Sequence, residues 1–242
     1  MENDNESDNE NINEEPNEDK WCFAWFPKTD MAGKTKAALA KEAKWDSGDR
    51  ITVSFLDGDP SIKEKVKQVA KQWVAPGLAN LRLDFRDDTN DTFIRISFKH
   101  AGSWSTVGTT CRQITDRSEP TMNYGWLTPD TPPTELQRVV LHEFGHALGL
   151  IHEHQNPSGG IPWNRQNVID DLSGPPNNWP LDVIEHNMFA PHAANETNFT
   201  GTDFSSIMMY PIPATWTTNG FSVGLNNDLS KKDKKFIRNQ YS

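Results

Sequence analysis

The chain has 242 residues with 24 basic and 34 acidic side chains, which give it a formal net charge of −10. Its length corresponds to one or two domains, and it has no run of about 20 apolar residues, so a membrane span is not expected. A nucleic-acid-binding protein usually presents a basic face. The acidic balance therefore argues against that class.

The first 20 residues differ from the rest in composition. They hold nine Asp or Glu and one Lys, a charge of −8 that leaves only −2 for the remaining 222 residues. Such a segment cannot bury enough apolar surface to offset its ordering entropy, so residues 1–20 are expected to form a disordered acidic tail. A single catalytic domain is expected over residues 21–242, with an upper lobe at about 45–151 and a lower lobe at about 152–242.

Strand and helix patterns alternate along the upper lobe. Residues 50–55 read as a strand, and apolar side chains at spacings of three and four predict an amphipathic helix over 60–74, with Pro60 in its first turn. Residues 81–85 and 93–98 alternate apolar with polar side chains, as half-buried strands do. The acidic residues between those two strands suit a turn, and structural calcium is not expected.

A second helix starts near Thr131, which suits the cap position, and Gly149 ends it. Beyond it, residues 153–228 are rich in Pro, Gly, Asn and Trp, and they predict an irregular lobe over a cleft. Ser230 and Asp233 have the spacing of a capping box for a closing helix.

The second helix carries the most informative spacing. His142 and His146 stand four residues apart and therefore share one helix face, where both imidazoles can reach one ion. Gly149 allows the chain to leave the helix and bring His152 back as a third ligand. Glu143 projects beside such an ion and can accept a proton from water. Three His and a Glu could also be ordinary polar residues, but this register is far rarer by chance than a bare HExxH pattern.

Three nitrogen ligands leave a fourth zinc position open, which is typical of catalytic rather than structural sites. Zinc suits neutral imidazoles and hydrolysis, although nickel, cobalt and copper also accept three nitrogens. One catalytic zinc ion is therefore the expected cofactor. The two cysteines, Cys22 and Cys111, permit one disulfide at most, and Cys22 could instead act as a thiolate that blocks the zinc.

The pattern from His142 to His152 resembles the HExxHxxGxxH signature of the metzincin metallopeptidases. Downstream, Ser206, Met208 and Tyr210 resemble the Met-containing turn of astacin-like enzymes of the bacterial and fungal type, and Glu153 matches their Glu after the third His. The likeness covers about residues 45–240. It implies that Met208 forms an apolar floor below the metal and that Tyr210 lies near the metal and stabilises the oxyanion.

The resemblance implies a metzincin-like zincin fold of the α+β class, with a twisted mixed sheet, two long helices and an irregular C-terminal lobe. The implied function is a secreted, monomeric zinc endopeptidase acting on protein or peptide substrates. An extended substrate is expected to pair with an edge strand near residues 121–125. Two alternatives are a catalytically silent zinc-binding module and a secreted adhesive domain that uses its nine Trp to contact carbohydrate.

Overall fold

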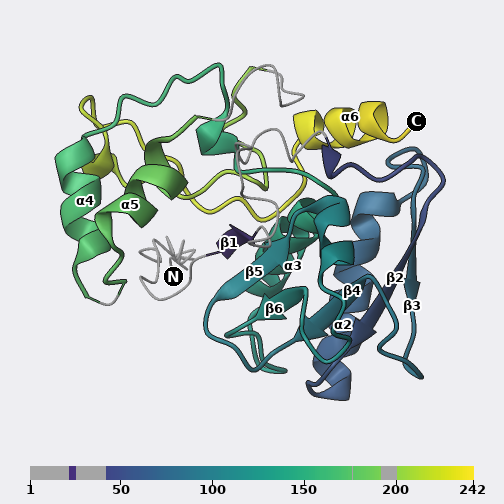
Figure 1. Ribbon diagram of the computed structural model, residues 1–242. Coiled ribbons are helices and arrows are strands. Elements are labelled where there is room, and N and C mark those ends of the chain that lie inside the picture. Colours follow the sequence, from purple (N-terminus) through teal and green to yellow (C-terminus); the bar gives the residue numbers. More distant parts are fainter. Residues whose placement is uncertain (1–21, 26–41, 176, 192–200) are drawn as a thin grey trace, which may run out of the picture.

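A six-stranded mixed sheet forms one side of the computed structural model, which describes residues 22–25, 42–175, 177–191 and 201–242 (Figure 1). The expected disordered tail, 1–20, lies outside the described residues. The strand order is β1-β5-β6-β4-β2-β3. The strands are β1 (Cys22–Trp25), β2 (Arg50–Phe55), β3 (Arg82–Phe85), β4 (Ile94–Ser97), β5 (Ser103–Thr106) and β6 (Met122–Tyr124).

Strand direction changes once across the sheet. β3, β2, β4 and β6 run parallel, β5 is antiparallel to β6, and β1 runs parallel to β5. Because β6 lies between β4 and β5, the segment 121–125 is central in the sheet. The expectation that a substrate pairs with an edge strand at this segment is therefore wrong, because β4 and β5 flank β6 and it is β5 that pairs with the edge strand β1.

Two helices pack side by side and bring their apolar faces to the core. Helix α2 (Pro60–Ala70) starts with Asp59, whose carboxylate accepts the N–H of Ser61, and continues as a 3₁₀ turn over Lys71–Val74. Its buried residues Ile62, Val66 and Ala70 follow the expected helical spacing. The helix predicted from the sequence over 60–74 is thus present, but its last turn is tighter.

Strand β4 contradicts the expectation of a half-buried strand, because all four of its residues are buried. Its polar residue Arg95 is covered by chain segments that supply carbonyl acceptors. The Arg95 guanidinium donates to the carbonyl oxygens of Thr92, Ile114 and Glu119 at 2.7 to 2.9 Å. Alternating apolar and polar residues show which side chains share a face of the strand, but not whether the polar face is exposed. A cation can be buried on that face when backbone carbonyls accept its hydrogen bonds.

Helix α3 (Pro133–Ala147) is buried on every side over its second half. It packs against α2 and against β1, β5 and β6. Thr131 is not its cap: Pro132 holds that position, and the Thr131 hydroxyl accepts the N–H of Thr128. Pro133 has no N–H, so the first turn has one fewer donor to satisfy.

The C-terminal part has short helices joined by irregular chain, as its composition predicts. These helices are α4 (Arg165–Ser173), α5 (Leu181–Ile184), a π-helical turn (Glu185–Phe189) and α6 (Lys231–Gln240). Ser230 and Asp233 form the predicted capping box of α6. In Figure 1, α4 and α5 lie at the left, away from the sheet with α2 and α3 at the right. No helix among the described residues is long and apolar enough to cross a membrane.

Candidate metal centre

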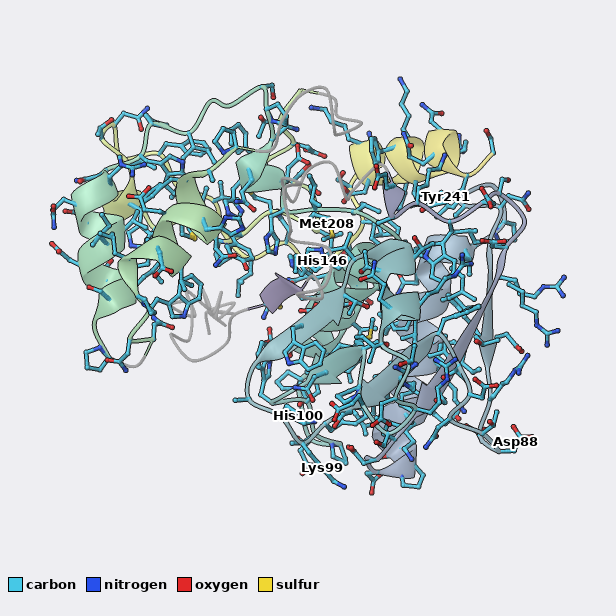
Figure 2. The ribbon with its side chains drawn as sticks, in the orientation of Figure 1. Asp88, Lys99, His100, His146, Met208 and Tyr241 are labelled. Atoms are coloured by element: carbon cyan, nitrogen blue, oxygen red, sulfur yellow. The ribbon has the colours of Figure 1, made fainter. Side chains whose placement is uncertain are left out.

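Helix α3 places two imidazoles against each other inside the protein. His142 and His146 are 3% and 0% exposed, and their ring centroids lie 4.8 Å apart. The four-residue spacing puts both rings on one face, one turn apart. Figure 2 shows His146 in the interior, next to the labelled Met208.

The third imidazole arrives through a turn that only glycine adopts easily. Gly149 has a φ of 90°, the left-handed region that favours glycine at helix ends. Its N–H donates to the carbonyl of His146, and the N–H of Leu150 donates to the carbonyl of Gly145. The chain then reverses, so that Nε2 of His152 lies 3.1 Å from Nε2 of His146.

The three imidazoles form a set with the geometry of a shared ion. One nitrogen from each of His142, His146 and His152 lies within 4.8 Å of the others, and all three side chains are buried. Tetrahedral zinc with Zn–N bonds of about 2.0–2.1 Å separates its nitrogens by roughly 3.4 Å. The 3.1 Å between His146 and His152 is close to that separation.

Backbone carbonyls set the tautomers of the two helical imidazoles. Nδ1 of His142 lies 2.8 Å from the carbonyl oxygen of Ile207, and Nδ1 of His146 lies 2.9 Å from that of Leu150. A carbonyl oxygen only accepts, so each Nδ1 carries the hydrogen and each neutral ring presents an Nε2 lone pair. His142 Nε2 is buried without a hydrogen-bond partner among the described residues, as a metal ligand would be.

Burial keeps these rings neutral. It lowers the pKa of His142 well below its ordinary value, with a further contribution from the neighbouring His146. It also lowers the pKa of His146 to about 4. Because a metal binds neutral imidazole, the ligands need lose no proton near neutral pH.

Glu143 lies beside the three imidazoles, directly after His142 on α3. It is fully buried, and neither carboxylate oxygen has a hydrogen-bond partner in the described part of the chain. Burial raises the pKa of Glu143 well above its ordinary value. A buried carboxyl group without partners costs free energy, and such perturbed groups concentrate at sites of chemistry.

The segment carrying Met208 and Tyr210 packs directly onto α3. Met208 is buried, and its sulfur packs so closely on Gly145 that a Cβ at this position would clash with Met208 Sδ. The Tyr210 ring centroid is 4.3 Å from that of His152. The sequence-predicted floor and phenol are thus both brought to the metal centre.

Glu153 connects the third imidazole to this segment. Its N–H donates to the carbonyl of Met208, and its carboxylate accepts from Asn156 Nδ2 and from the N–H of Asp203. Burial raises the pKa of Glu153 to about 7. The residue is therefore a structural link between the two sides of the site.

Strand β1 covers the open side of this centre. β1 pairs with β5, and in this register Cys22 lies opposite Ser103. The Tyr210 hydroxyl donates a hydrogen bond to the carbonyl of Cys22. Cys22 Sγ lies within 4.8 Å of a His142 nitrogen and of a Glu143 carboxylate oxygen. Cys22 and Cys111 are both free thiols, so the disulfide that the sequence permits is not formed.

Sequence reasoning missed the groups that hold the metal centre from outside. The carbonyls of Leu150 and Ile207 orient two imidazoles, but a backbone acceptor has no sequence signal. His154 was also missed; its buried ring stacks on that of Tyr210 at 4.6 Å between centroids. Asp233 was recognised only as a helix cap.

Myroilysin is among the proteins whose solved structures are similar to this chain. One solved structure of myroilysin is 42% identical in sequence to this chain and has a TM-score of 0.80. The match covers 84% of this chain and 97% of that one. A crystal structure of myroilysin is 40% identical to this chain and has a TM-score of 0.66. The match covers 92% of this chain and 90% of that one. No protein-family model and no curated protein sequence matches the chain.

Proposed function

The chain belongs to the family of myroilysin, a metallopeptidase, and from that membership we propose that it is a zinc-dependent endopeptidase of the astacin-like metzincin type. The observation that carries the proposal is the buried set of His142, His146 and His152 around one point. The subtype is supported by Tyr210, which follows Met208 by two residues and whose ring lies tilted against that of His152, with 4.3 Å between the centroids. As the resemblance implies, the enzyme is proposed to be secreted.

The donor set suits zinc. Three imidazoles, two of which have carbonyl-bound Nδ1 atoms, are ordinary zinc ligands, and they leave a position free for catalysis. When bound there, zinc would polarise the scissile carbonyl and lower the pKa of a water ligand from its ordinary value to about 7. The protein side chains would supply the remaining steps.

Glu143 is proposed as the group that moves the proton. Its carboxylate lies beside the imidazoles and would accept a proton from the attacking water once Cys22, which lies against it here, has moved away. The same carboxyl would then deliver that proton to the leaving amine. The apolar surroundings that raise its pKa favour a group that holds a proton during the reaction.

Tyr210 is proposed to donate a hydrogen bond to the oxyanion that develops on the substrate. Its buried hydroxyl donates to the carbonyl of Cys22, so it already binds a backbone carbonyl of an extended segment. Burial raises the pKa of Tyr210, which keeps the phenol protonated and able to donate.

An extended substrate is proposed to pair with β5 in the place that β1 holds. Main-chain hydrogen bonds to Ser103–Thr106 would orient it, while side-chain pockets would set sequence preference. The described structure is then a latent form, because β1 covers this edge and Cys22 lies against Glu143. Burial raises the pKa of the Cys22 thiol; a metal at the imidazoles would favour the thiolate instead.

Latency can be tested in the full chain. Cys22→Ala removes the thiol that lies against the imidazoles and Glu143, so β1 should leave the edge of β5 more readily and the uncut chain should cleave peptide faster than the parent. Cys111→Ala is the matched control, since Cys111 is also a buried free thiol. An equal, low activity in both variants would contradict a blocking role for Cys22.

The proposed activity is tested with a quenched fluorescent casein. The full chain, and the same chain after limited proteolysis, are assayed with and without a chelator and after zinc is restored. Cleavage that the chelator abolishes and zinc restores is expected. A silent zinc-binding module would bind zinc without cleavage, and cleavage insensitive to the chelator would contradict the metal mechanism.

A further inference from the structure

Asp233 makes more hydrogen bonds than a helix cap requires. It stands in the first turn of α6 and is buried, and its carboxylate accepts from the N–H of Ser230 at 2.9 Å as part of the capping box. The same carboxylate also accepts from the hydroxyl of Ser206 at 2.7 Å and from the N–H of Ile207 at 2.9 Å. These two donors belong to the segment that carries Met208.

Ile207 joins this carboxylate to the metal centre. Its N–H is bound by Asp233, and its carbonyl oxygen accepts from Nδ1 of His142 at 2.8 Å. The N–H of Ile207 is thus bound by a carboxylate, and its carbonyl oxygen is bound by a proposed metal ligand. A group that binds the second nitrogen of a ligating His sets its tautomer and its orientation.

Ser206 provides a second hydrogen bond between the Asp233 carboxylate and the segment that carries Met208. While its hydroxyl donates to Asp233, it accepts the N–H of Met208 at 3.0 Å. Met208 in turn packs against Gly145 on α3. Asp233 therefore sets where the turn lies relative to the helix that carries His142.

Resting on the zinc site proposed above, we propose that Asp233 is a positioning residue for His142, acting through the Ile207 peptide groups. His146 provides an internal comparison, because its Nδ1 is bound by the carbonyl of Leu150, which belongs to its own turn. Loss of the Asp233 contact should then change the surroundings of His142 and leave those of His146 as they are.

The test uses the full chain with ¹⁵N-labelled histidine and two readouts besides activity. The first is the zinc dissociation constant from competition with a chelator, and the second is the solvent-exchange rate of each imidazole Nδ1 proton. Asp233→Asn keeps the shape but offers one acceptor oxygen where the carboxylate offers two. It is expected to weaken zinc binding by about 10- to 100-fold, as for other groups that orient ligating His, and to speed exchange at His142 but not at His146.

Ser230→Ala is the matched control. It removes the capping hydroxyl of α6, which accepts the N–H of Asp233 and donates to the Asp203 carboxylate, but leaves the donors from Ser206 and Ile207 in place. It is expected to lower the unfolding temperature without changing zinc binding. Equal zinc affinity in both variants and in the parent chain, or equal weakening in both, would overturn the positioning role.

Ser206→Ala serves as the second variant where Asp233→Asn does not fold. It removes one of the two donors from the turn and is expected to speed exchange at His142 by a smaller factor; unchanged exchange would overturn the proposal. A parent chain that binds no zinc would instead contradict the proposed function. In that case the exchange rate of the His142 Nδ1 proton in the zinc-free chain still decides whether Asp233 acts on it.

Discussion

The two sides of the metal centre are held by different means. On one side, helix α3 positions His142, Glu143 and His146 by regular spacing, and its surroundings are apolar over its buried half. On the other side, Met208 and Tyr210 lie in irregular chain whose place is fixed by the buried carboxyl group of Asp233 and the partly buried one of Glu153. The peptide groups of a helix bond to one another, so a helix needs few partners from elsewhere. The buried peptide groups of irregular chain must each find a separate hydrogen-bond partner.

This difference predicts where substitutions have the largest effects. Groups on α3 should supply the ligands and the proton transfer, so their loss should abolish metal binding or catalysis. Groups on the irregular side should tune a centre that already exists, so their loss should have smaller and separable effects.

Substitution of a ligand on α3 should have the largest effect. His146→Ala is expected to lose zinc and all peptide cleavage, because two imidazoles hold zinc much more weakly than three. Zinc content after gel filtration, measured by atomic absorption, checks this. The control is His100→Ala, an exposed His that Figure 2 shows away from His146. Full zinc content in the His146 variant would remove that residue from the ligand set.

Glu143→Ala should have the next largest effect. It is expected to keep zinc and to lose cleavage by about 10⁴-fold, the upper range for loss of a general acid–base group. The measurement is kcat/KM on a quenched peptide, together with zinc content. Glu64→Ala, an exposed Glu on α2, is the control. Cleavage near the parent rate would show that another group moves the proton.

The sequence predicted the regular side well because its signals are periodic. His142, His146 and His152 were identified from spacing with Gly149, and the structure brings these three imidazoles together. The irregular side was predicted only in outline. The capping box of α6 was found from Ser230 and Asp233, but contacts to a turn more than 20 residues away leave no local pattern.

Strands with polar or short sequences were the main failures in the sheet. β5 reads Ser-Trp-Ser-Thr, and β1 has only four residues next to the acidic tail, so neither shows a clear alternation of apolar side chains. The alternation over residues 93–98 predicted a half-buried strand, yet Arg95 is buried there and three carbonyls accept its hydrogens. In both cases the structure depends on contacts with residues distant in the sequence, and local sequence patterns do not show such contacts.

On the irregular side, Tyr210→Phe should have an intermediate effect. It removes the hydroxyl proposed to donate to the oxyanion, and kcat is expected to fall by about 10- to 100-fold with little change in KM. Steady-state kinetics on the activated chain measure this. Tyr241→Phe is the matched control, since the Tyr241 hydroxyl donates to the carbonyl of Leu148 and has no place in the reaction. An unchanged kcat in the Tyr210 variant would leave that residue a packing role.

Glu153→Gln should have the smallest effect, and it should appear in the pH dependence of stability. Burial raises the pKa of Glu153 from 4.5 to about 7, so the folded protein binds this proton more tightly than the unfolded chain. Its contribution is therefore present below about pH 4.5 and is lost as the pH rises through about 7. Gln stays neutral, so the variant should gain stability relative to the parent as the pH rises from 4.5 to 8, by at most about 3 kcal/mol.

Urea unfolding of the zinc-free proteins at several pH values gives this difference. The imidazoles with lowered pKa values titrate in both proteins and cancel in the comparison. A difference that does not change with pH would mean that Glu153 keeps an ordinary pKa.

The sharing of one ion by three imidazoles is tested most directly by zinc-edge X-ray absorption of the zinc-loaded Cys22→Ala chain. One zinc per chain is expected, with three imidazole nitrogens at about 2.0–2.1 Å and a remaining light-atom ligand. A zinc ion with two or fewer imidazole ligands, or a chain that takes up no zinc at this position, would contradict the metal centre formed by His142, His146 and His152.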